Sequence, residues 1–543
     1  MQRWLSFHPY NRAQHCDHYY LKLCKEIYDL FRDENFPDDE LAISDEEKMD
    51  LACFLVCYFE DVISGPGLWR AFTIQVNKFY GKFLPFFDLD PDEYYPDEIN
   101  PEDIYFLMWY YLSMVHCNDQ LISPMIYERL DQSERIFEIL EREYEAAPNN
   151  YKLKQLLHVI PEEYDFYIIR EKLKWIMLDS WLHHFLGEKF MDLNKDLLPG
   201  ERNEPIPEET RSLYLMDAMD SYIHLTYTPL LARQGKEWLA YILGKDHPLF
   251  RPLLEMGEKK SGFYLYLGKE GDHQLFRYIA TGTELRVHAG SMEVPDGSKP
   301  GRSIMYGGFV KWKDKWWFTG AQLVWGEDDN LIRNEQESEE SKRLFKDPAV
   351  QKEENRQIFN SFLNFNKGTP LAFVENVEAA KVFIRDLLVF HDRSTRRSAR
   401  WGQKGRRKPG RGVGEDFEHK IPEPDVVTID SIPGDDADEV DTTTIPGMIY
   451  CDPETGIELV FGYNDLIPDS RNTWYAEDGN GEDRAGAAMM MMESQYISGN
   501  WMKYLVSSYD LPGLDFPGPD GQDLLLDNLD FMLRFWKRKD YYG

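Results

Sequence analysis

Nine cationic residues lie between positions 393 and 411, and no acidic residue separates them. Lys and Arg neutralise phosphates and an aromatic ring can stack on a base, so this composition is typical of a nucleic-acid or other polyanion contact. It is more often typical of a solvated, disordered loop, and we favour that interpretation. This basic tract consists of Arg393, Arg396, Arg397, Arg400, Trp401, Lys404, Arg406, Arg407, Lys408 and Arg411.

An acidic segment follows the basic tract directly. Residues 415–441 contain eleven acidic residues and one lysine. Because the two segments are joined, the acidic one competes with any polyanion at a high effective concentration. Two interpretations stay open: a charged linker, or a polyanion contact that the acidic segment controls.

Cysteine and histidine patterns that could bind metal are weak. Cys53 and Cys57 share a helix face inside an apolar run, where small buried thiols are ordinary core residues. A second group lacks the paired two-residue spacing of zinc sites. Its members are His15, Cys16, His18 and Cys24. We therefore expect no metal ligands and no cofactor.

Sequence signatures of catalysis are also missing. The Gly-x-Ser-x-Gly elbow, the phosphate loop ending in Gly-Lys-Ser/Thr and the His-Glu-x-x-His helix do not occur. His183 and His184 follow Trp181 in a helical pattern, and core histidines explain them best because no partner is identifiable. Catalytic residues stay unknown at this stage.

Composition limits the classes of partner. The 543 residues include 96 acidic and 61 basic ones, a formal charge of −35, which repels nucleic acids and anionic membranes except at local sites. The longest uncharged apolar stretch, Ile104–Asn118, is too short to span a bilayer. Six scattered cysteines and an N-terminus without a signal-peptide pattern predict a reducing, cytoplasmic location.

The elements needed to position these residues are mostly helical in the first half of the chain. Apolar residues recur at helical spacing from about residue 16 to 245, as at Tyr20, Leu23, Cys24, Ile27, Leu30 and Phe31. A long helix is expected between Pro161 and Gly187. After Ser261, short aromatic and β-branched runs separated by glycine turns predict strands, with a tight hairpin connection at Lys313-Asp314-Lys315.

These patterns predict an α+β protein. We expect a helical domain at 1–250, a small antiparallel β-sheet or barrel at 255–330, helices at 331–390, a charged linker or long loop at 391–446, and a β-hairpin with helices at 447–543. The hairpin is expected from Gly447–Tyr450 and Ile457–Phe461, which flank a turn-rich segment.

Several stretches resemble an uncharacterised family of Bacteroidota proteins known only as a domain of unknown function. The resemblance is carried by Trp4–Tyr10, Tyr19–Leu23, Trp109–Leu112, Ser123-Pro124, Phe137–Leu140 through Ala147-Pro148, and Ile169–Trp175. It implies a bacterial cytoplasmic protein and brings no activity or catalytic residue.

The leading functional expectation is a non-enzymatic protein-interaction or scaffold protein, because catalytic signatures are missing and aromatic residues, which are enriched at interfaces, are abundant. One alternative is nucleic-acid association through the basic tract. Another is a hydrolase or transferase whose carboxylate or histidine site is assembled from distant segments. We expect a protein partner and no membrane contact.

Overall fold

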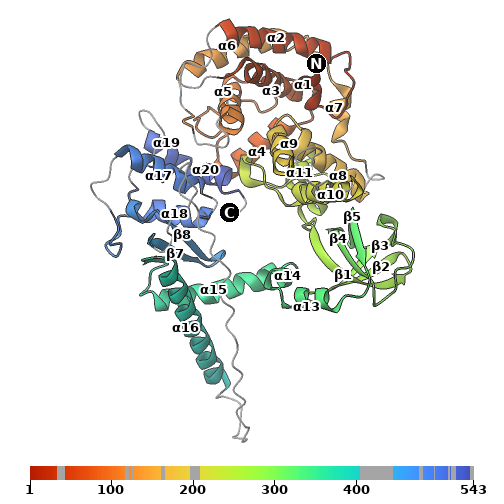
Figure 1. Cartoon of the computed structure of the whole chain (residues 1–543). Coiled ribbons are helices and arrows are strands. Elements are labelled where there is room, and N and C mark those ends of the chain that lie inside the picture. The colour runs from red at the N-terminus through yellow and green to blue at the C-terminus, as the bar shows by residue number, and fades with distance from the viewer. Residues whose placement is uncertain are drawn as a thin grey trace, which may run out of the picture. The chain divides into compact units, whose positions relative to one another are not determined.

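A computed structural model shows the chain as two compact units (Figure 1). Met1–Phe345 and Phe516–Lys539 form the first unit, and Lys346–Asp515 with Asp540–Gly543 form the second. The structure describes residues 1–33, 43–116, 122–124, 127–160, 165–195, 208–403, 444–475, 481–494, 496–511, 514 and 521–538. The α+β class is confirmed, with helices in both units and two separate sheets.

The N-terminal part of the first unit is helical. Its elements are α1 (Gln2–Ser6), α2 (Asp17–Asp33), α3 (Asp45–Ser64), α4 (Leu68–Tyr80), α5 (Pro101–Tyr111), η1 (Leu112–His116), α6 (Tyr127–Glu143), α7 (Tyr151–Leu156), α8 (Phe166–Lys174), η3 (Trp175–Asp179), α9 (His184–Leu193), α10 (Glu208–Leu225), η5 (Leu230–Ala232), α11 (Gly235–Leu243) and α12 (Phe250–Leu254). The apolar stripe predicted for α2 is buried at Tyr20, Leu23, Cys24, Ile27 and Phe31.

Helix α3 forms the centre of this part because its apolar residues cover every side. Ser44 and Glu47 form a reciprocal capping box at its start, and Gly65, with a φ of 71°, ends it in the left-handed conformation. An uninterrupted run from Leu51 to Asp61 is buried. Two carboxylates in this run, Glu60 and Asp61, are therefore inside the protein and need partners.

The single helix expected between Pro161 and Gly187 is interrupted, so that prediction is wrong. Helix α8 passes into the π-helix η3, and Ser180 is extended, with φ −69° and ψ 145°. The Ser180 hydroxyl donates to the carbonyl of Ile176 at 2.6 Å. A Cβ on Gly187 would lie 2.2 Å from the Leu178 carbonyl oxygen, so this glycine allows α9 to pack tightly against η3.

The predicted β region is a closed five-stranded barrel. Its strands are β1 (Lys260–Glu270), β2 (His273–Tyr278), β3 (Glu284–His288), β4 (Ile304–Trp312) and β5 (Lys315–Trp325), in the order β1-β2-β3-β5-β4. The predicted hairpin joins β4 to β5, but its turn is only Lys313-Asp314, because Lys315 already belongs to β5 and pairs with Trp312. One pair, β3 with β5, is parallel, so the barrel is a mixed sheet.

The barrel is attached to the helical part of the same unit. The Tyr167 hydroxyl lies 2.8 Å from the carbonyl oxygens of both Ser291 and Phe318. Phe166 stacks on Trp317, with ring centroids 5.7 Å apart. Helices α13 (Asp329–Glu337) and α14 (Glu339–Arg343) follow the barrel in the sequence.

The last helices of the chain also belong to the first unit. They are α19 (Gly521–Asp527) and α20 (Leu529–Trp536). Phe531 and Phe535 are buried, and their rings pack against Phe86 and Trp109. The C-terminal helix thus completes a core that begins far away in the sequence.

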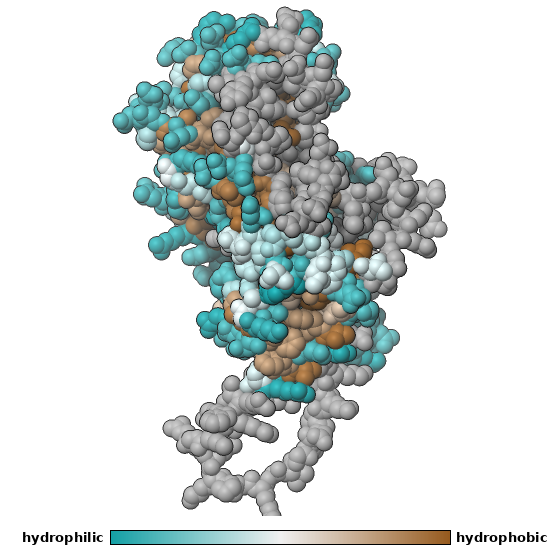
Figure 2. Space-filling view, turned by 90° about the vertical axis from the view of Figure 1, so that its left-hand side faces the viewer, coloured by the Kyte–Doolittle hydropathy of each residue, from teal (hydrophilic) through white to brown (hydrophobic). Residues whose placement is uncertain are grey.

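The second unit combines a three-stranded sheet with helices. It contains α15 (Pro348–Phe365), β6 (Leu371–Val374), α16 (Val377–Gln403), β7 (Gly447–Asp452), β8 (Gly456–Phe461), η7 (Asn464–Leu466), α17 (Gly481–Glu493) and α18 (Gly499–Ser508). The predicted hairpin is β7–β8, and β6 pairs with β7 on its other side. In Figure 2, hydrophobic residues gather on the lower part of the visible face, above the grey trace.

The segment expected as a linker, 391–446, begins in a helix. Helix α16 continues to Gln403, since Arg and Ala favour helix even where apolar residues are sparse. Residues 404–443 lie outside the described part of the chain.

A search for membrane-spanning helices among the described residues finds no single helix of sufficient length and apolar character. The α3 and α4 pair, bent by 87° at its junction, passes this test by length and composition when the two are taken together.

Candidate functional site

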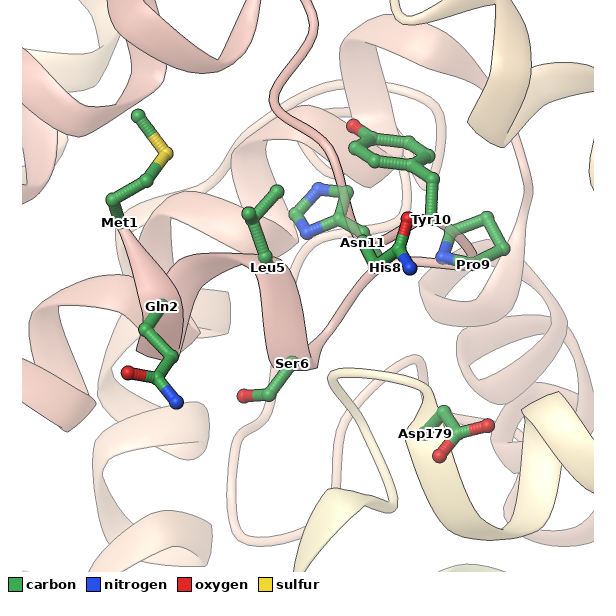
Figure 3. Close-up of a pocket in the computed structure, with 9 residues that line it drawn as sticks. All are labelled: Met1, Gln2, Leu5, Ser6, His8, Pro9, Tyr10, Asn11 and Asp179. Atoms are coloured by element: carbon green, nitrogen blue, oxygen red, sulfur yellow. The ribbon is translucent and has the colours of Figure 1, made fainter.

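Two pockets lie beside the N-terminal segment in the first unit. The larger has a volume of about 1040 Å³ and is lined by residues of the 1–11 segment together with Asp179 (Figure 3). The smaller has a volume of about 700 Å³ and lies along α9. Ser6 and Asp179 line both pockets, so α1 and the end of η3 form their shared wall.

Asp179 is the most informative residue of this shared wall. Its carboxylate forms no hydrogen bond or ion pair with any residue that the structure describes, although the side chain is half-buried. Burial raises the pKa of Asp179, and the positive charge of Lys174, which lines the same smaller pocket, opposes this effect. An unpaired, partly desolvated carboxylate in a pocket is a candidate ligand contact.

Of the other charged groups that line the smaller pocket, Arg3 and Glu188 are paired within the protein, whereas Lys174 and Asp192 form no ion pair with a described residue. Arg3 forms ion pairs with Asp50 at 2.9 Å and with Glu188 at 2.7 Å. Asp179 differs from Asp192 in being half-buried and in lining both pockets.

His184 adds a second acceptor to the smaller pocket. Its Nδ1 lies 3.1 Å from the Trp181 carbonyl oxygen and therefore carries the proton, while Nε2 is buried with no hydrogen-bond partner among the described residues. Burial lowers the pKa of His184 to about 4, so the ring is neutral at pH 7. The unpaired groups at this wall accept hydrogen bonds and carry negative charge.

A buried polar network lies behind the larger pocket. The His8 and Glu60 side chains are each 1 % exposed, and His8 Nε2 lies 2.7 Å from Glu60 Oε2. His8 Nδ1 lies 2.8 Å from the carbonyl oxygen of Trp4. Contact with Glu60 raises the pKa of His8 against the opposing effect of burial.

Asp17, at the start of α2, extends this network. Its Oδ1 accepts from the Trp4 indole at 3.0 Å and from the Tyr10 hydroxyl at 2.9 Å. Asn150 donates to Tyr10 and also to Glu60 Oε1, at 2.9 Å for the latter. We call His8, Tyr10, Asp17, Glu60 and Asn150 the His8 network.

The described residues of the two pockets do not pair a nucleophile with a base. Ser6, the hydroxyl shared by both, donates to the Arg3 carbonyl at 2.6 Å and has no histidine or carboxylate as a base among the described residues. The His8 and Glu60 side chains are almost completely shielded from solvent. A nucleophile and a base are therefore not brought together here.

The basic tract predicted from the sequence is only partly described. Arg393 is exposed on α16. The backbone of Arg396, Arg397, Arg400 and Trp401 is helical, but their side chains lie outside the described residues. Lys404, Arg406, Arg407, Lys408 and Arg411 lie outside them entirely.

Most of the cysteines and histidines singled out by the sequence are core residues in the structure, but His15 and His18 are exposed. Cys53 and Cys57 are buried free thiols in α3. His183 and His184 are buried, and burial lowers the pKa of His183 to about 3. The expectation of core histidines is met for both, although His184 also borders the smaller pocket.

Sequence reasoning missed the residues that make up this site. His8, Glu60 and Asp179 come from three separate segments, so no local spacing connects them. The only available signal was the resemblance stretch Trp4–Tyr10, which contains His8 and Tyr10 without assigning them a role.

Comparison with known proteins finds one matching family model, which covers the N-terminal part of the chain. No curated protein and no solved structure matches the chain. All the stretches that carried the resemblance lie in the N-terminal helical part, as do both pockets and the His8 network. Residues 1–255 match the model of the family described as Protein of unknown function (DUF3843).

Proposed function

We propose that the protein is a non-enzymatic interaction protein that binds a cationic side chain of a protein partner at the wall formed by α1 and η3. The observation that carries this proposal is the Asp179 carboxylate, half-buried, shared by both pockets and unpaired among the described residues. A lysine or arginine from a partner supplies the missing counter-charge.

The surroundings of Asp179 favour a protein ligand. Leu178 and Met191 give the smaller pocket apolar walls, and Leu5 does the same for the larger one. Two neighbouring pockets with mixed polar and apolar linings suit a peptide segment whose side chains occupy both. The formal charge of −35 attracts cationic partners at long range.

Site-specific photo-crosslinking in the native cell tests this proposal. A benzophenone amino acid at Leu5, which lines the larger pocket, is expected to capture one defined partner segment. The same group at Tyr151, which is 70 % exposed on α7, serves as the control. A synthetic peptide of the captured segment then allows direct affinity measurement.

The peptide measurement decides the role of Asp179. Replacing the basic residue of the peptide by Gln, or Asp179 by Asn, is expected to weaken binding by about tenfold, which corresponds to one charge-assisted contact of 1.4 kcal/mol. Asp192→Asn, an exposed carboxylate that lines the same smaller pocket, is the matched control. Identical crosslinking from Leu5 and Tyr151, or equal affinities for both peptides, would contradict the proposal.

Nucleic-acid association through the basic tract is a second candidate function. One observation favours it: α16 runs to Gln403, so positions 393, 396, 397 and 400 recur at helical spacing along one helix. Changing these four arginines to Gln is expected to remove a salt-sensitive affinity for single-stranded DNA. Arg385→Gln, on the same helix, is the control, and equal binding by both variants argues against the tract.

A cytoplasmic location accompanies the leading proposal. The described cysteines, Cys16, Cys24, Cys53, Cys57 and Cys451, are buried free thiols, as is common for proteins of a reducing compartment. Fractionation of the native cells tests this location.

A further inference from the structure

The centre of the His8 network brings three possible metal-binding side chains together. The ligand atoms of His8, Asp17 and Glu60 all lie within 4.8 Å of one another, and all three residues are buried. One imidazole nitrogen and two carboxylates are a donor set that first-row divalent metals accept.

The hydrogen bonds around His8 determine which ring nitrogen faces the carboxylate. Nδ1 faces the Trp4 carbonyl oxygen at 2.8 Å, and a carbonyl can only accept, so Nδ1 carries the proton of the neutral ring. Nε2 of that neutral ring is then an acceptor facing another acceptor, Glu60 Oε2, at 2.7 Å. Either a proton lies between these two atoms, or the two side chains rotate slightly apart and both bind one metal ion.

A divalent metal ion would offset more of the buried negative charge than a proton does. With a proton, the imidazolium offsets one of the two carboxylates, and a net negative charge remains buried, which is costly. Lys152 lies over the Tyr10 ring at 5.4 Å, but it is exposed and hydrated. A divalent cation with neutral His8 and ionised Asp17 and Glu60 leaves no net charge.

Neighbouring residues hydrogen-bond to the three proposed ligands, as residues around the ligands of metal sites commonly do. The Trp4 carbonyl orients the imidazole, Asn150 holds the second oxygen of Glu60, and the Trp4 indole and Tyr10 hydroxyl hold Asp17. Such contacts fix the orientation of histidine and carboxylate ligands and tune metal affinity. Donors around a tetrahedral ion are about 3.4 Å apart, given bonds of about 2.1 Å, so small side-chain rotations suffice.

We propose that His8, Asp17 and Glu60 bind one divalent first-row metal ion of the zinc, manganese or iron class. The ion ties the segment after α1 to α2 and α3, and so fixes the wall of the larger pocket. This site is independent of the cation-recognition role of Asp179.

Metal titration of the full-length chain tests the proposal. After removal of metals by a chelator, Co²⁺ is added, and its visible absorption reports nitrogen and oxygen ligation, while Zn²⁺ and Mn²⁺ binding is followed by thermal unfolding. The expected result is saturation at one ion per chain and a raised Tm. Wild-type protein with no saturable Co²⁺ spectrum and no change in Tm with any of the three ions overturns the proposal.

Variants separate this site from the many surface carboxylates. Glu60→Gln and Asp17→Asn preserve side-chain shape, and each is expected to weaken metal affinity at least about tenfold. The control is Glu458→Gln, a half-buried carboxylate of the second unit that accepts hydrogen bonds from Thr455 and Ser498. Equal affinity in wild type and both site variants also overturns the proposal, because surface acids then bind the ion.

Discussion

The His8 network and the Asp179 wall lie close together in the first unit, yet they treat buried polar groups in opposite ways. In the network, both oxygens of Glu60 have partners, from His8 and Asn150. At the wall, the Asp179 carboxylate and His184 Nε2 have none among the described residues. Paired buried groups hold a fold together, whereas unpaired acceptors beside a pocket indicate a ligand.

Removing a member of the network should have the largest effect on stability. Glu60→Ala leaves the His8 ring and the Asn150 amide without their partner inside the protein. We expect a loss of about 3–5 kcal/mol in the free energy of unfolding, typical of breaking a buried charged pair. Denaturant unfolding measures this loss.

Asp192→Ala is the control for this measurement. Asp192 is exposed, and its loss should change stability by no more than about 0.5 kcal/mol. If Glu60→Ala lowers the free energy of unfolding no more than Asp192→Ala does, the network contributes little to the stability of the fold.

Three buried histidines, His183, His184 and His224, have no hydrogen-bond partner for Nε2 among the described residues. They should make the stability of the protein sensitive to acid. Burial lowers the pKa of His224 to about 3, helped by Lys259 and Arg170, against an ordinary value of 6.5. Above pH 6.5 both folded and unfolded states are neutral at this residue. As pH falls from 6.5 towards 3, only the unfolded state gains the proton, so stability decreases.

A ring-preserving variant isolates this effect. His224 stacks on Phe166, so His224→Phe keeps a ring in place. Between pH 6.5 and 4.5 the variant should lose about 2–3 kcal/mol less stability than wild type, from the linkage over two pH units. Buried Asp61 and Asp103, whose pKa values burial raises to about 6, act in the opposite direction, so the wild-type profile alone is insufficient. Parallel profiles for variant and wild type would refute the neutral state of His224.

A third substitution tests a paired carboxylate next to Glu60. Asp61 accepts hydrogen bonds from the backbone N–H groups of Gly67, Leu68 and Trp69, at the start of α4. Asp61→Asn keeps one acceptor oxygen and places an amide where the other was. We expect a loss of about 1–2 kcal/mol, as for a helix cap, measured by thermal unfolding.

Sequence periodicity predicted those elements whose cause is local. The stripe of α2, the Lys313-Asp314 turn and the β7–β8 hairpin each follow from residues close together in the chain. The break at Ser180 depends on α9 packing against η3 through Gly187, and the placement of α20 depends on Phe86 and Trp109. Such contacts leave no periodic signal.

The candidate site was beyond sequence reasoning for the same physical reason. His8 and Glu60 are 52 positions apart, and Asn150 is 90 positions beyond Glu60. Among 96 acidic residues, the sequence does not distinguish a buried carboxylate from a solvated one. Whether Asp179 has a partner also depends on the surrounding fold, so the sequence alone does not predict it.

The smallest expected effect on stability belongs to Asp179, and its sign separates binding from folding. Because burial raises the pKa of Asp179, its ionised form is less favourable in the folded state than in the unfolded one at neutral pH. Asp179→Asn removes that penalty, so thermal unfolding at pH 7 should show a change between zero and a gain of about 0.5 kcal/mol. A clear loss of stability in Asp179→Asn would mean that the Asp179 carboxylate stabilises the fold, as the Glu60 carboxylate does. A gain, together with weakened partner binding, is the combination expected where a protein keeps an unpaired charge for its ligand.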